Sequence, residues 1–471
     1  MNSFFQKKSL IINFLVTVTL TYLVISLMFP TTEAEIPVGA DGETPSAEIE
    51  YPVYAEGGKP VATVCFSKQS PASLKPVLTW TKVEGAVAYE IEFFHELPET
   101  AEGPYVHPVP FFSSREIYVN GFNADLTEFL QDNIFYWRVR GLDLDGKPVG
   151  EFSDAVKVYL DRNKDIRQKP VPTSIFNQST GSTLLYPVYA WIPVNGADKY
   201  EVEILDAPPE NPNGIMPSVH RIDSAIAVGF DYYDVTPRFA AKPFYWRVRG
   251  MDRDGRPVGV FSDAGEFILN PDEPVPVATF GDSITHGGGS VSYSPADWEF
   301  SYQHYLDFPT INLGKSGDTS QTMVERFDQD VLPFKPQILL IMAGSNSVRG
   351  SYTAQSIIDD LQVLEEKCLK NGIRPVFLTL PPINPDNINR VFNEETDPDW
   401  QEKLQQVNAF IRTREYIDIA QDMGDEQGIL PTGMAIDGLH LDMKGKQAIA
   451  AVINANWQHI LQSPTSVEVK G

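Results

Sequence analysis

The sequence predicts a multidomain protein in which two tandem antiparallel β-sandwiches precede an α/β/α domain with a parallel sheet. Two observations predict this order. An aromatic-rich unit of about 110 residues occurs twice, and its strands alternate apolar and polar residues with a period of two. After a Pro-rich linker at residues 270–274, short apolar runs alternate with helical patterns, which is typical of a parallel sheet covered on both faces.

The N-terminal segment predicts export. Lys7 and Lys8 precede an apolar run that ends at Phe29, and acidic residues follow it. This order of charges places the N-terminus in the cytoplasm and the rest of the chain outside. A small-residue site ending at Ala34 favours a cleaved signal peptide, but a run of roughly 20 residues can also remain as a membrane anchor. We therefore expect residues 1–34 to be a signal peptide or an N-terminal anchor, and the protein to be secreted or anchored facing outward.

The duplicated unit carries the same strand and turn signals in both copies. The sequence Phe-Tyr-Trp-Arg-Val-Arg-Gly at residues 135–141 recurs at residues 244–250, and each copy is followed by an Asp-Gly pair suited to a hairpin turn. These residues resemble fibronectin type III-like modules. We therefore expect such β-sandwiches at residues 46–162 and 168–270.

The tryptophans of the two units allow two interpretations. Aromatic faces can stack on sugar rings and bind a cell-surface glycan, whereas tryptophans at inward strand positions form the core of a sandwich. The positions on the strands favour the core, and the units are then expected to act as spacers ahead of the last domain. The residues concerned are Trp80, Trp137, Trp191 and Trp246.

Composition excludes several functions. The chain has 63 acidic residues against 37 Lys and Arg, and its net charge of −26 argues against binding to nucleic acid. The two cysteines, Cys65 and Cys368, can build neither a disulfide framework nor a Cys-based zinc site. No His, Asp and Glu residues have the spacing of metal ligands, so we expect neither a metal nor a cofactor.

The last part of the chain alternates predicted strands and helices. The strands are predicted at residues 275–280, 310–313, 337–342 and 375–380, and the clearest helices at residues 353–369, 399–414 and 444–459. Parallel sheets place their chemistry at the carboxyl ends of the strands, so polar residues that directly follow the apolar runs are candidates for a site.

Polar blocks follow three of these runs, and a fourth block lies near the C-terminus. They are Gly281-Asp282-Ser283, the segment from Gly314 to Asp318, Gly344-Ser345-Asn346 and Asp437-Gly438-Leu439-His440. Four such blocks in this order resemble the SGNH (GDSL) hydrolase family. The resemblance implies a flavodoxin-like catalytic domain over residues 273–465 that hydrolyses carboxylic esters.

Ser283, His440 and Asp437 are the candidate catalytic residues. A serine hydroxyl is a weak nucleophile unless a base removes its proton, and imidazole, with an ordinary pKa of about 6.5, suits that role near neutrality. Asp437 lies three residues before His440 and can hold the second imidazole nitrogen, as in other Ser-His-Asp sites. The family resemblance assigns the oxyanion hole to the backbone N–H groups of Ser283 and Gly317 and to the side chain of Asn346.

Asp282, His286 and Arg349 are candidates for a pocket beside these residues. Each also has a simpler interpretation: Asp282 as a hydrogen-bonding residue of its loop, His286 as a satisfied loop histidine and Arg349 as a partner in a surface salt bridge. Ser347 departs from the family, which usually has Asp after the block asparagine. We expect this change to alter local hydrogen bonding.

The expected function is that of an extracytoplasmic serine esterase that acts through an acyl-enzyme. Export together with accessory β units favours short acyl groups, such as acetyl, on carbohydrate. A lipid-ester hydrolase of the lysophospholipase or thioesterase type is the alternative, because the block at residues 316–321 also resembles such members. A surface binding protein without activity is a third reading, which the intact set of Ser, Gly, Asn, Asp and His argues against. The expected partner is thus a small-molecule or polysaccharide ester, with membrane contact only through the N-terminal segment.

Overall fold

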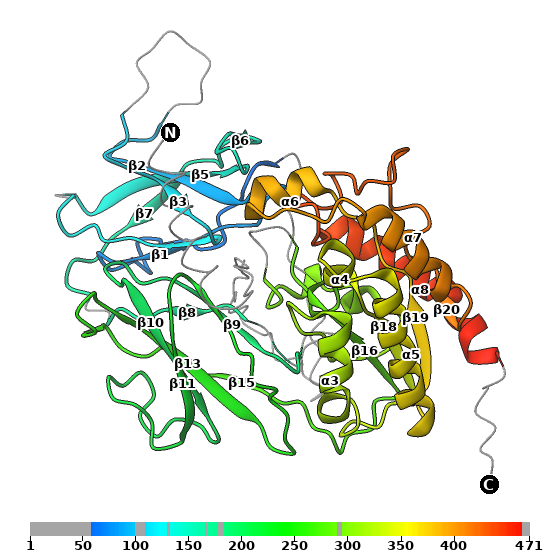
Figure 1. Ribbon diagram of the computed structural model, residues 1–471. Helices are drawn as coiled ribbons and strands as arrows, with labels where there is room; N and C mark the ends of the chain where they lie inside the picture. The colour runs from blue at the N-terminus through cyan, green and yellow to red at the C-terminus, as the bar shows by residue number, and fades with distance from the viewer. Residues whose placement is uncertain are drawn as a thin grey trace, which may run out of the picture.

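The structure is a computed structural model that describes residues 58–98, 109–129, 132–164, 167–174, 176, 183–289 and 294–463. Within these ranges, antiparallel sheets come first and an α/β domain follows (Figure 1). The predicted signal peptide or anchor, residues 1–34, lies outside the described residues. No helix in the described ranges combines the length and the apolar character that a membrane crossing requires.

The first β unit (residues 58–164) consists of a five-stranded and a two-stranded antiparallel sheet. The larger sheet contains β2 (Ala88–Phe94), β3 (Phe112–Ile117), β5 (Ile134–Leu142), β6 (Pro148–Val149) and β7 (Val156–Tyr159), and the smaller one β1 (Val77–Thr79) and β4 (Gly121–Asn123). Strand β5 alternates as predicted, because Phe135, Trp137 and Val139 are buried while the residues between them are partly exposed.

The second β unit (residues 167–269) repeats this arrangement. Its larger sheet contains β10 (Lys199–Leu205), β11 (Arg221–Ala227), β13 (Phe244–Met251), β14 (Pro257–Val258) and β15 (Gly265–Phe267), and its three-stranded sheet β8 (Val171–Pro172), β9 (Val188–Ile192) and β12 (Asp231–Tyr233). The four tryptophans of the two units are fully buried, which confirms that they are core residues.

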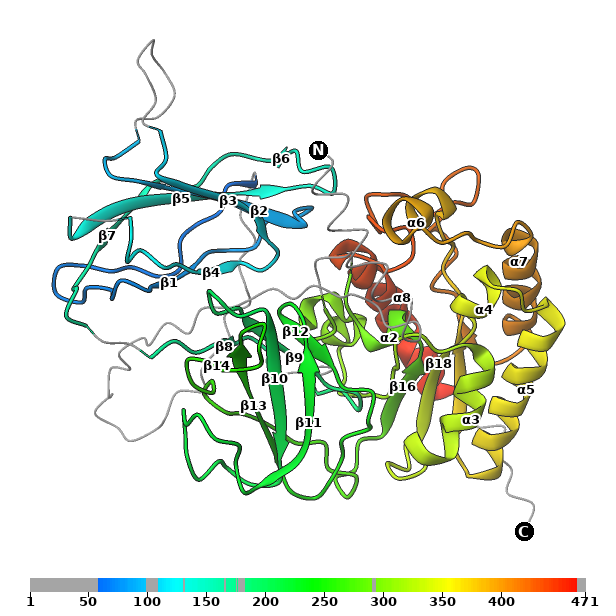
Figure 2. The same cartoon turned by 60° about the vertical axis from the view of Figure 1, so that its left-hand side comes forward.

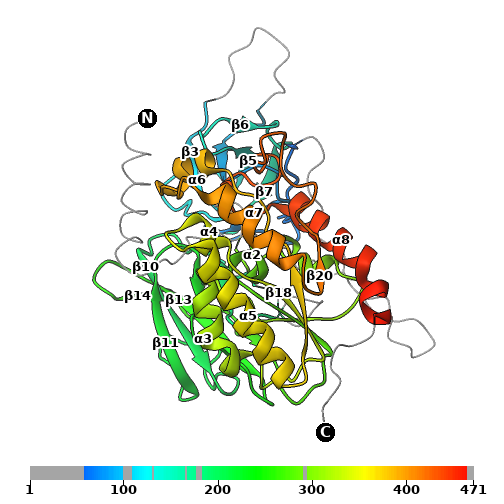
Figure 3. The ribbon, with the colours of Figure 1, turned by 45° about the vertical axis from the view of Figure 1, so that its right-hand side comes forward.

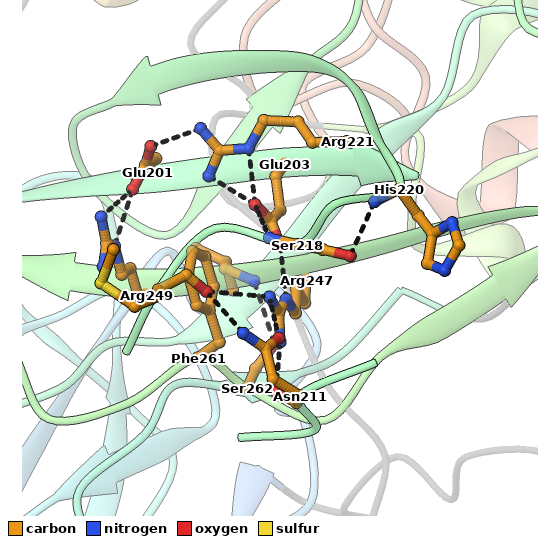
Figure 4. A network of polar contacts seen from close by, with 12 residues as sticks. Glu201, Glu203, Asn211, Ser218, His220, Arg221, Arg247, Arg249, Phe261 and Ser262 are labelled. Carbon is orange, nitrogen blue, oxygen red and sulfur yellow. Dashed lines mark hydrogen bonds and ion pairs between the residues drawn. The ribbon is translucent and has the colours of Figure 1, made fainter. Parts of the chain in front are cut away.

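Cross-strand ion pairs explain why the Trp-Arg-Val-Arg motif occurs in both units. In the second unit, Arg247 on β13 lies opposite Glu203 on β10, and Arg247 Nε is 2.5 Å from Glu203 Oε1 (Figure 4). Arg249 lies opposite Glu201 in the same way, with Nε 2.6 Å from Oε2. The equivalent pairs of the first unit are Arg138–Glu92 and Arg140–Glu90. Opposite charges placed directly across an antiparallel pair stabilise its register, so the duplicated motif fixes how the central strands pair.

The C-terminal domain (residues 273–463) is built on a five-stranded parallel sheet in the order β17-β16-β18-β19-β20. Its strands are β16 (Val277–Gly281), β17 (Ile311–Asn312), β18 (Ile338–Met342), β19 (Arg374–Leu378) and β20 (Tyr416–Ile417). The second strand along the chain lies outside the first, and this is the order of flavodoxin-like folds. The predicted fold class is therefore confirmed.

Helices cover both faces of this sheet (Figures 1 and 3). On one face α3 (Ser320–Asp330), α5 (Ala354–Lys370) and α7 (Trp400–Ile411) pack side by side, and on the other α8 (Met443–Gln462) packs against the 3-10 helix η3 (Tyr302–Tyr305). The shorter helices are α2 (Ser283–His286), α4 (Ser345–Arg349), α6 (Pro385–Phe392) and the 3-10 helix η2 (Trp298–Phe300).

The β units share apolar core with the C-terminal domain. Leu185 and Tyr186 of the second unit are buried in the same cluster as Val277 and Phe280 of β16. In the other direction, Phe300 of the C-terminal domain is buried in the cluster of the first unit. Figure 2 accordingly shows the second unit directly beside β16 and α2. The units are thus packed onto the domain and are not held apart from it by the linker.

Candidate active site

The chain makes a tight turn from β16 into α2, and Ser283 is the first residue of that helix. Asp282 caps the helix, because its Oδ1 accepts a hydrogen bond of 3.0 Å from the Ile284 N–H. Gly281 leaves no room for a side chain, since a Cβ there would lie 2.7 Å from the carbonyl oxygen of Met342 on β18. This local geometry places the Ser283 hydroxyl at the carboxyl end of the sheet.

Ser283, His440 and Asp437 form a continuous hydrogen-bonded chain. His440 Nε2 is 2.9 Å from Ser283 Oγ, and His440 Nδ1 is 2.8 Å from Asp437 Oδ2. The three residues are 3%, 5% and 1% exposed. Because the Asp437 carboxylate only accepts, Nδ1 carries the proton, and Nε2 is left to accept the hydrogen of the serine hydroxyl.

Asp437 and His440 are held together by one tight turn. The second carboxylate oxygen, Asp437 Oδ1, accepts the backbone N–H groups of Leu439 and His440 at 2.8 and 2.7 Å. Gly438 has a φ of +82°, and a Cβ there would lie 2.4 Å from the carbonyl oxygen of Asn384. The turn therefore requires glycine, and the carboxylate cannot swing away from the imidazole without losing two backbone hydrogen bonds.

The predicted oxyanion donors follow the neighbouring strands. Gly317, with a φ of +89°, lies in the loop after β17, and Asn346 lies in α4 after β18. Asn346 Nδ2 donates to the carbonyl oxygen of Asp318 at 2.9 Å. Its Oδ1 accepts from Arg349 Nε at 3.1 Å, and Arg349 Nη1 is 2.7 Å from Glu394 Oε2. The Arg349–Glu394 pair thus fixes which way the Asn346 amide points.

Asp282, His286 and Arg349 are all buried and hydrogen-bonded within the protein. Burial raises the pKa of Asp282 to about 6, and burial lowers the pKa of His286 to about 3. The contacts of Asp282 and His286 agree with the simpler interpretations of these residues. Arg349 forms the expected ion pair, with Glu394, but it is buried and also donates to Asn346.

Ser347, which departs from the family pattern, connects α4 to the start of α3. Its Oγ accepts the backbone N–H of Ser320 at 3.0 Å. Ser320 Oγ in turn donates to Asp360 on α5 at 2.6 Å. Ser347 thus forms part of a hydrogen-bond chain between α4, α3 and α5, and Asn346 precedes it in α4.

Arg326 on α3 is a supporting residue that the sequence analysis missed. Its guanidinium donates to the carbonyl oxygens of Gly281 and Leu313 at 3.0 and 2.9 Å, at the ends of β16 and β17. It also pairs with Asp318 and Asp330. Burial alone would lower the pKa of Arg326, but the two carboxylates outweigh it and raise the pKa. Arg326 therefore ties the nucleophile turn to the loop that carries Gly317.

Lys446 on α8 is a second residue that was missed. Its side chain is fully buried, and Nζ donates to the carbonyl oxygen of Ile284 in the nucleophile helix at 2.7 Å. Burial lowers the pKa of Lys446 to about 7, against the opposing effect of Asp282 and two other carboxylates. A signal existed in the sequence, since Lys446 lies three residues before Ile449 on the apolar stripe of α8.

His, Cys, Asp and Glu side chains can hold metal ions, and cysteines can also form disulfides. In the part of the chain that the structure describes, no group of three or more His, Cys, Asp or Glu side chains is placed to hold a metal ion. Both cysteines are free thiols; Cys65 is exposed, and burial raises the pKa of Cys368 to about 12.

Known proteins resemble the C-terminal domain. Residues 279–448 match the GDSL-like Lipase/Acylhydrolase family. The C-terminal part of the chain is a GDSL-like acylhydrolase domain. The members of this family are carboxylic ester hydrolases. The family match does not extend to the β units, whose likeness to fibronectin type III modules stays a prediction.

Individual relatives of the acylhydrolase domain are distant. The uncharacterized lipoprotein YqeF of Bacillus subtilis is 28% identical over 131 residues, which cover 23% of this chain and 49% of that protein. The chain thus spans about half the length of this curated relative.

Solved structures also resemble this part of the chain. A putative acylhydrolase from Bacteroides fragilis is 19% identical, with a TM-score of 0.34, and the match covers 40% of this chain and 91% of that one. A GDSL-like lipase from Bacteroides thetaiotaomicron is 22% identical, with a TM-score of 0.32, and the match covers 39% and 88%. A lipase/acylhydrolase from Enterococcus faecalis is 21% identical, with a TM-score of 0.31, and the match covers 39% of this chain and 95% of that one.

Proposed function

We propose that the protein is an extracytoplasmic serine esterase that cleaves carboxylic esters through an acyl-enzyme, with Ser283 as nucleophile, His440 as base and Asp437 as the residue that orients it. The observation that carries the proposal is the position of His440, whose two ring nitrogens lie 2.9 Å from Ser283 Oγ and 2.8 Å from Asp437 Oδ2. Nucleophile, base and orienting carboxylate within hydrogen-bond distance are the arrangement that activates a serine.

The reaction proceeds in two halves. Ser283 Oγ attacks the ester carbonyl carbon while His440 Nε2 takes the hydroxyl proton, and the imidazolium that forms is stabilised by Asp437. The tetrahedral intermediate then collapses, His440 gives the proton to the departing alcohol, and the acyl group stays on Ser283. Water, deprotonated by His440, attacks the acyl-enzyme in the same way and releases the acid.

The negative charge of the intermediate needs donors that are already in place. The backbone N–H groups of Ser283 and Gly317 and the Asn346 amide are the proposed donors, and each follows one of three adjacent strands. One such donor contributes about 3–4 kcal/mol to stabilisation of the transition state. Preorganisation of Asn346 by Arg349 supports this role.

We propose short acyl groups, such as acetyl, on carbohydrate as the substrate class, with small soluble esters also accepted. Export is supported by the charge order around residues 10–29 and by the relative that is named a lipoprotein. The net charge of −26 disfavours close approach to anionic lipid surfaces. The lipid-ester alternative keeps support from the description of the family as lipase-like.

A chain-length series distinguishes the two substrates. We expect kcat/KM on p-nitrophenyl esters to fall from acetate to octanoate, and acetate to be released from acetylated glycans. An increase with chain length, together with release of fatty acid from a lysophospholipid, would favour the lipid alternative.

A single substitution tests the catalytic assignment. Ser283→Ala should lower ester hydrolysis by several orders of magnitude without unfolding the protein, because the triad residues act as a unit. Ser113→Ala, at an exposed position of β3, is the matched control and should retain full activity. Activity of Ser283→Ala within tenfold of the wild type would refute the assignment.

A further inference from the structure

The second β unit extends the sheet of the acylhydrolase domain beside the active site. Leu184 forms a parallel bridge with Asn312 of β17, and the Leu185 N–H donates to the Asn312 carbonyl oxygen at 3.1 Å. Tyr186, the next residue, is buried, and its hydroxyl donates to Asp330 Oδ2 on α3 at 2.6 Å. The backbone of residues 184–186 is therefore fixed to the domain through both main chain and side chain.

His286 connects this segment to the nucleophile helix. It is the last residue of α2, three residues after Ser283, and its ring is fully buried. Its Nε2 lies 2.7 Å from the carbonyl oxygen of Tyr186. Because a carbonyl oxygen only accepts, Nε2 carries the ring proton and donates it to Tyr186.

The other ring nitrogen holds the loop after β17. His286 Nδ1 is 2.8 Å from Ser316 Oγ, and with the proton on Nε2 it accepts the hydrogen of the Ser316 hydroxyl. The backbones of the loop and the helix also approach closely, since a Cβ on Gly314 would lie 2.3 Å from the backbone nitrogen of His286. Burial lowers the pKa of His286 to about 3, so the ring stays neutral and keeps this direction of donation.

We propose that the second β unit positions the oxyanion hole: the Tyr186 carbonyl holds His286, and His286 holds Ser316, so that the neighbouring Gly317 N–H is aimed at the oxyanion. The proposal rests on the proposed function, which assigns Gly317 as a donor. His286 is a positioning residue, because it reaches the reaction only through Ser316. The β unit would then contribute to catalysis and not only to the distance between enzyme and cell surface.

Two substitutions at His286 separate the two links in the full-length protein. The amide of asparagine reaches the position of Nδ1 and can still accept from Ser316, whereas the amide of glutamine reaches the position of Nε2 and can still donate to Tyr186. His286→Gln therefore breaks the link to Ser316 and His286→Asn the link to Tyr186. Ser316→Ala also removes the contact between His286 and Ser316, by deleting the hydroxyl on the loop.

We expect each of the three variants to lower kcat on p-nitrophenyl acetate by about tenfold and to leave KM unchanged. The loss should be smaller than the roughly 10²–10³-fold loss of kcat that follows complete removal of one oxyanion donor, because the Gly317 N–H is misplaced but still present. Such a split between kcat and KM is the mark of an interaction made in the transition state. The double variant of Ser316→Ala and His286→Gln should have the same kcat as either single variant, because both substitutions remove the same hydrogen bond between His286 and Ser316.

A partly buried histidine elsewhere provides the matched control. His304 on η3 packs edge-on against Trp298, with the two ring centroids 3.7 Å apart. His304→Gln and His304→Asn should lower the melting temperature and leave kcat unchanged. If the His286 variants do the same, His286 has only a structural role and the proposal is wrong.

The remaining outcomes are also decisive. Wild-type kcat in Ser316→Ala would overturn the proposal even where the His286 variants fail to fold. If His286→Asn alone retains the wild-type kcat, the contact between His286 and Tyr186 does not affect catalysis, and the proposed role of the second β unit is wrong. Failure of the proposed function is recognised separately, because in that case Ser283→Ala itself would remain active.

Discussion

Replacing Lys82 with alanine should destabilise the protein by about 3–5 kcal/mol, the usual effect of removing one partner from a buried ion pair. Lys82 lies in the first β unit, and its ammonium contacts Asp297 Oδ1 at 2.7 Å and the Glu299 carboxylate, both in the acylhydrolase domain. The side chains of Lys82, Asp297 and Glu299 are 0%, 1% and 4% exposed. The substitution therefore leaves two buried carboxylates without their cation.

The size of the effect should be constant through the neutral pH range. Burial alone would lower the pKa of Lys82, but Asp297 and Glu299 outweigh it and raise the pKa above its ordinary value. A raised pKa in the folded state means that the stabilisation is fully present below the unfolded value of about 10.4 and is lost as the pH rises through the folded value. At pH 7–8 the whole contribution is measured.

Thermal unfolding followed by calorimetry gives the readout. With roughly 2–4 °C per kcal/mol, the melting temperature of Lys82→Ala should fall by about 6–20 °C. Lys59→Ala is the matched control in the same unit, because Lys59 pairs with Asp154 at a site where the side chains are 40% and 86% exposed. Such a pair contributes about 0–1 kcal/mol. If Lys82→Ala lowers the melting temperature no more than Lys59→Ala does, the reasoning is refuted.

Three further outcomes are expected. Asn346→Ala should lower kcat by about 10²–10³-fold in steady-state assays, the effect of losing one oxyanion donor, and an unchanged kcat would exclude Asn346 from that role. Asp437→Asn should lower kcat by about 10⁴-fold, because an amide can donate to the imidazole and hold the wrong tautomer; a loss below tenfold would contradict this. Burial raises the pKa of Asp282 to about 6, whereas the pKa of an aspartate in the unfolded chain is about 3.9. The folded state is therefore stabilised by protonation of Asp282 at a pH below about 3.9, and this stabilisation is lost as the pH rises through 6. The melting temperature of Asp282→Asn relative to the wild type should therefore increase between pH 4 and pH 7, and a constant difference would show that Asp282 does not titrate in this way.

Much of the acylhydrolase domain could be predicted because its signals are local. The predicted helices at 353–369, 399–414 and 444–459 correspond to α5, α7 and α8, whose bounds differ from the predictions by at most three residues. Ser283, Gly317 and Asn346 lie in short motifs after β16, β17 and β18, and the parallel sheet brings the ends of these strands together. Asp437 and His440 come from a fourth motif, just before α8. Strand β20, at residues 416–417, is too short to produce a pattern of its own.

Helix α3 was not predicted because its buried face is polar. It buries Arg326 and Asp330 beside Met323 and Phe327, so the apolar period is interrupted at the positions that support the active site. Buried cations of this kind resemble surface residues in a sequence, since only their partners reveal that they are inside. The partner carboxylate of Arg326 at Asp318 lies on the loop before the helix, where it looked like a motif residue.

The relation between the β units and the acylhydrolase domain could not be predicted for a different reason. The sequence favours spacers, because each unit has its own aromatic core and a Pro-rich linker follows. The structure instead places Tyr186 in the core of the acylhydrolase domain and Phe300 in the core of the first unit. The contacts that join them, such as Tyr186 with His286, link residues 100 positions apart, and neither residue departs from the pattern of its own segment. Because shared core residues cannot be removed without exposing apolar surface on both sides, the acylhydrolase domain and the β units form one packed structure, and their division of labour has to be tested within the full-length chain.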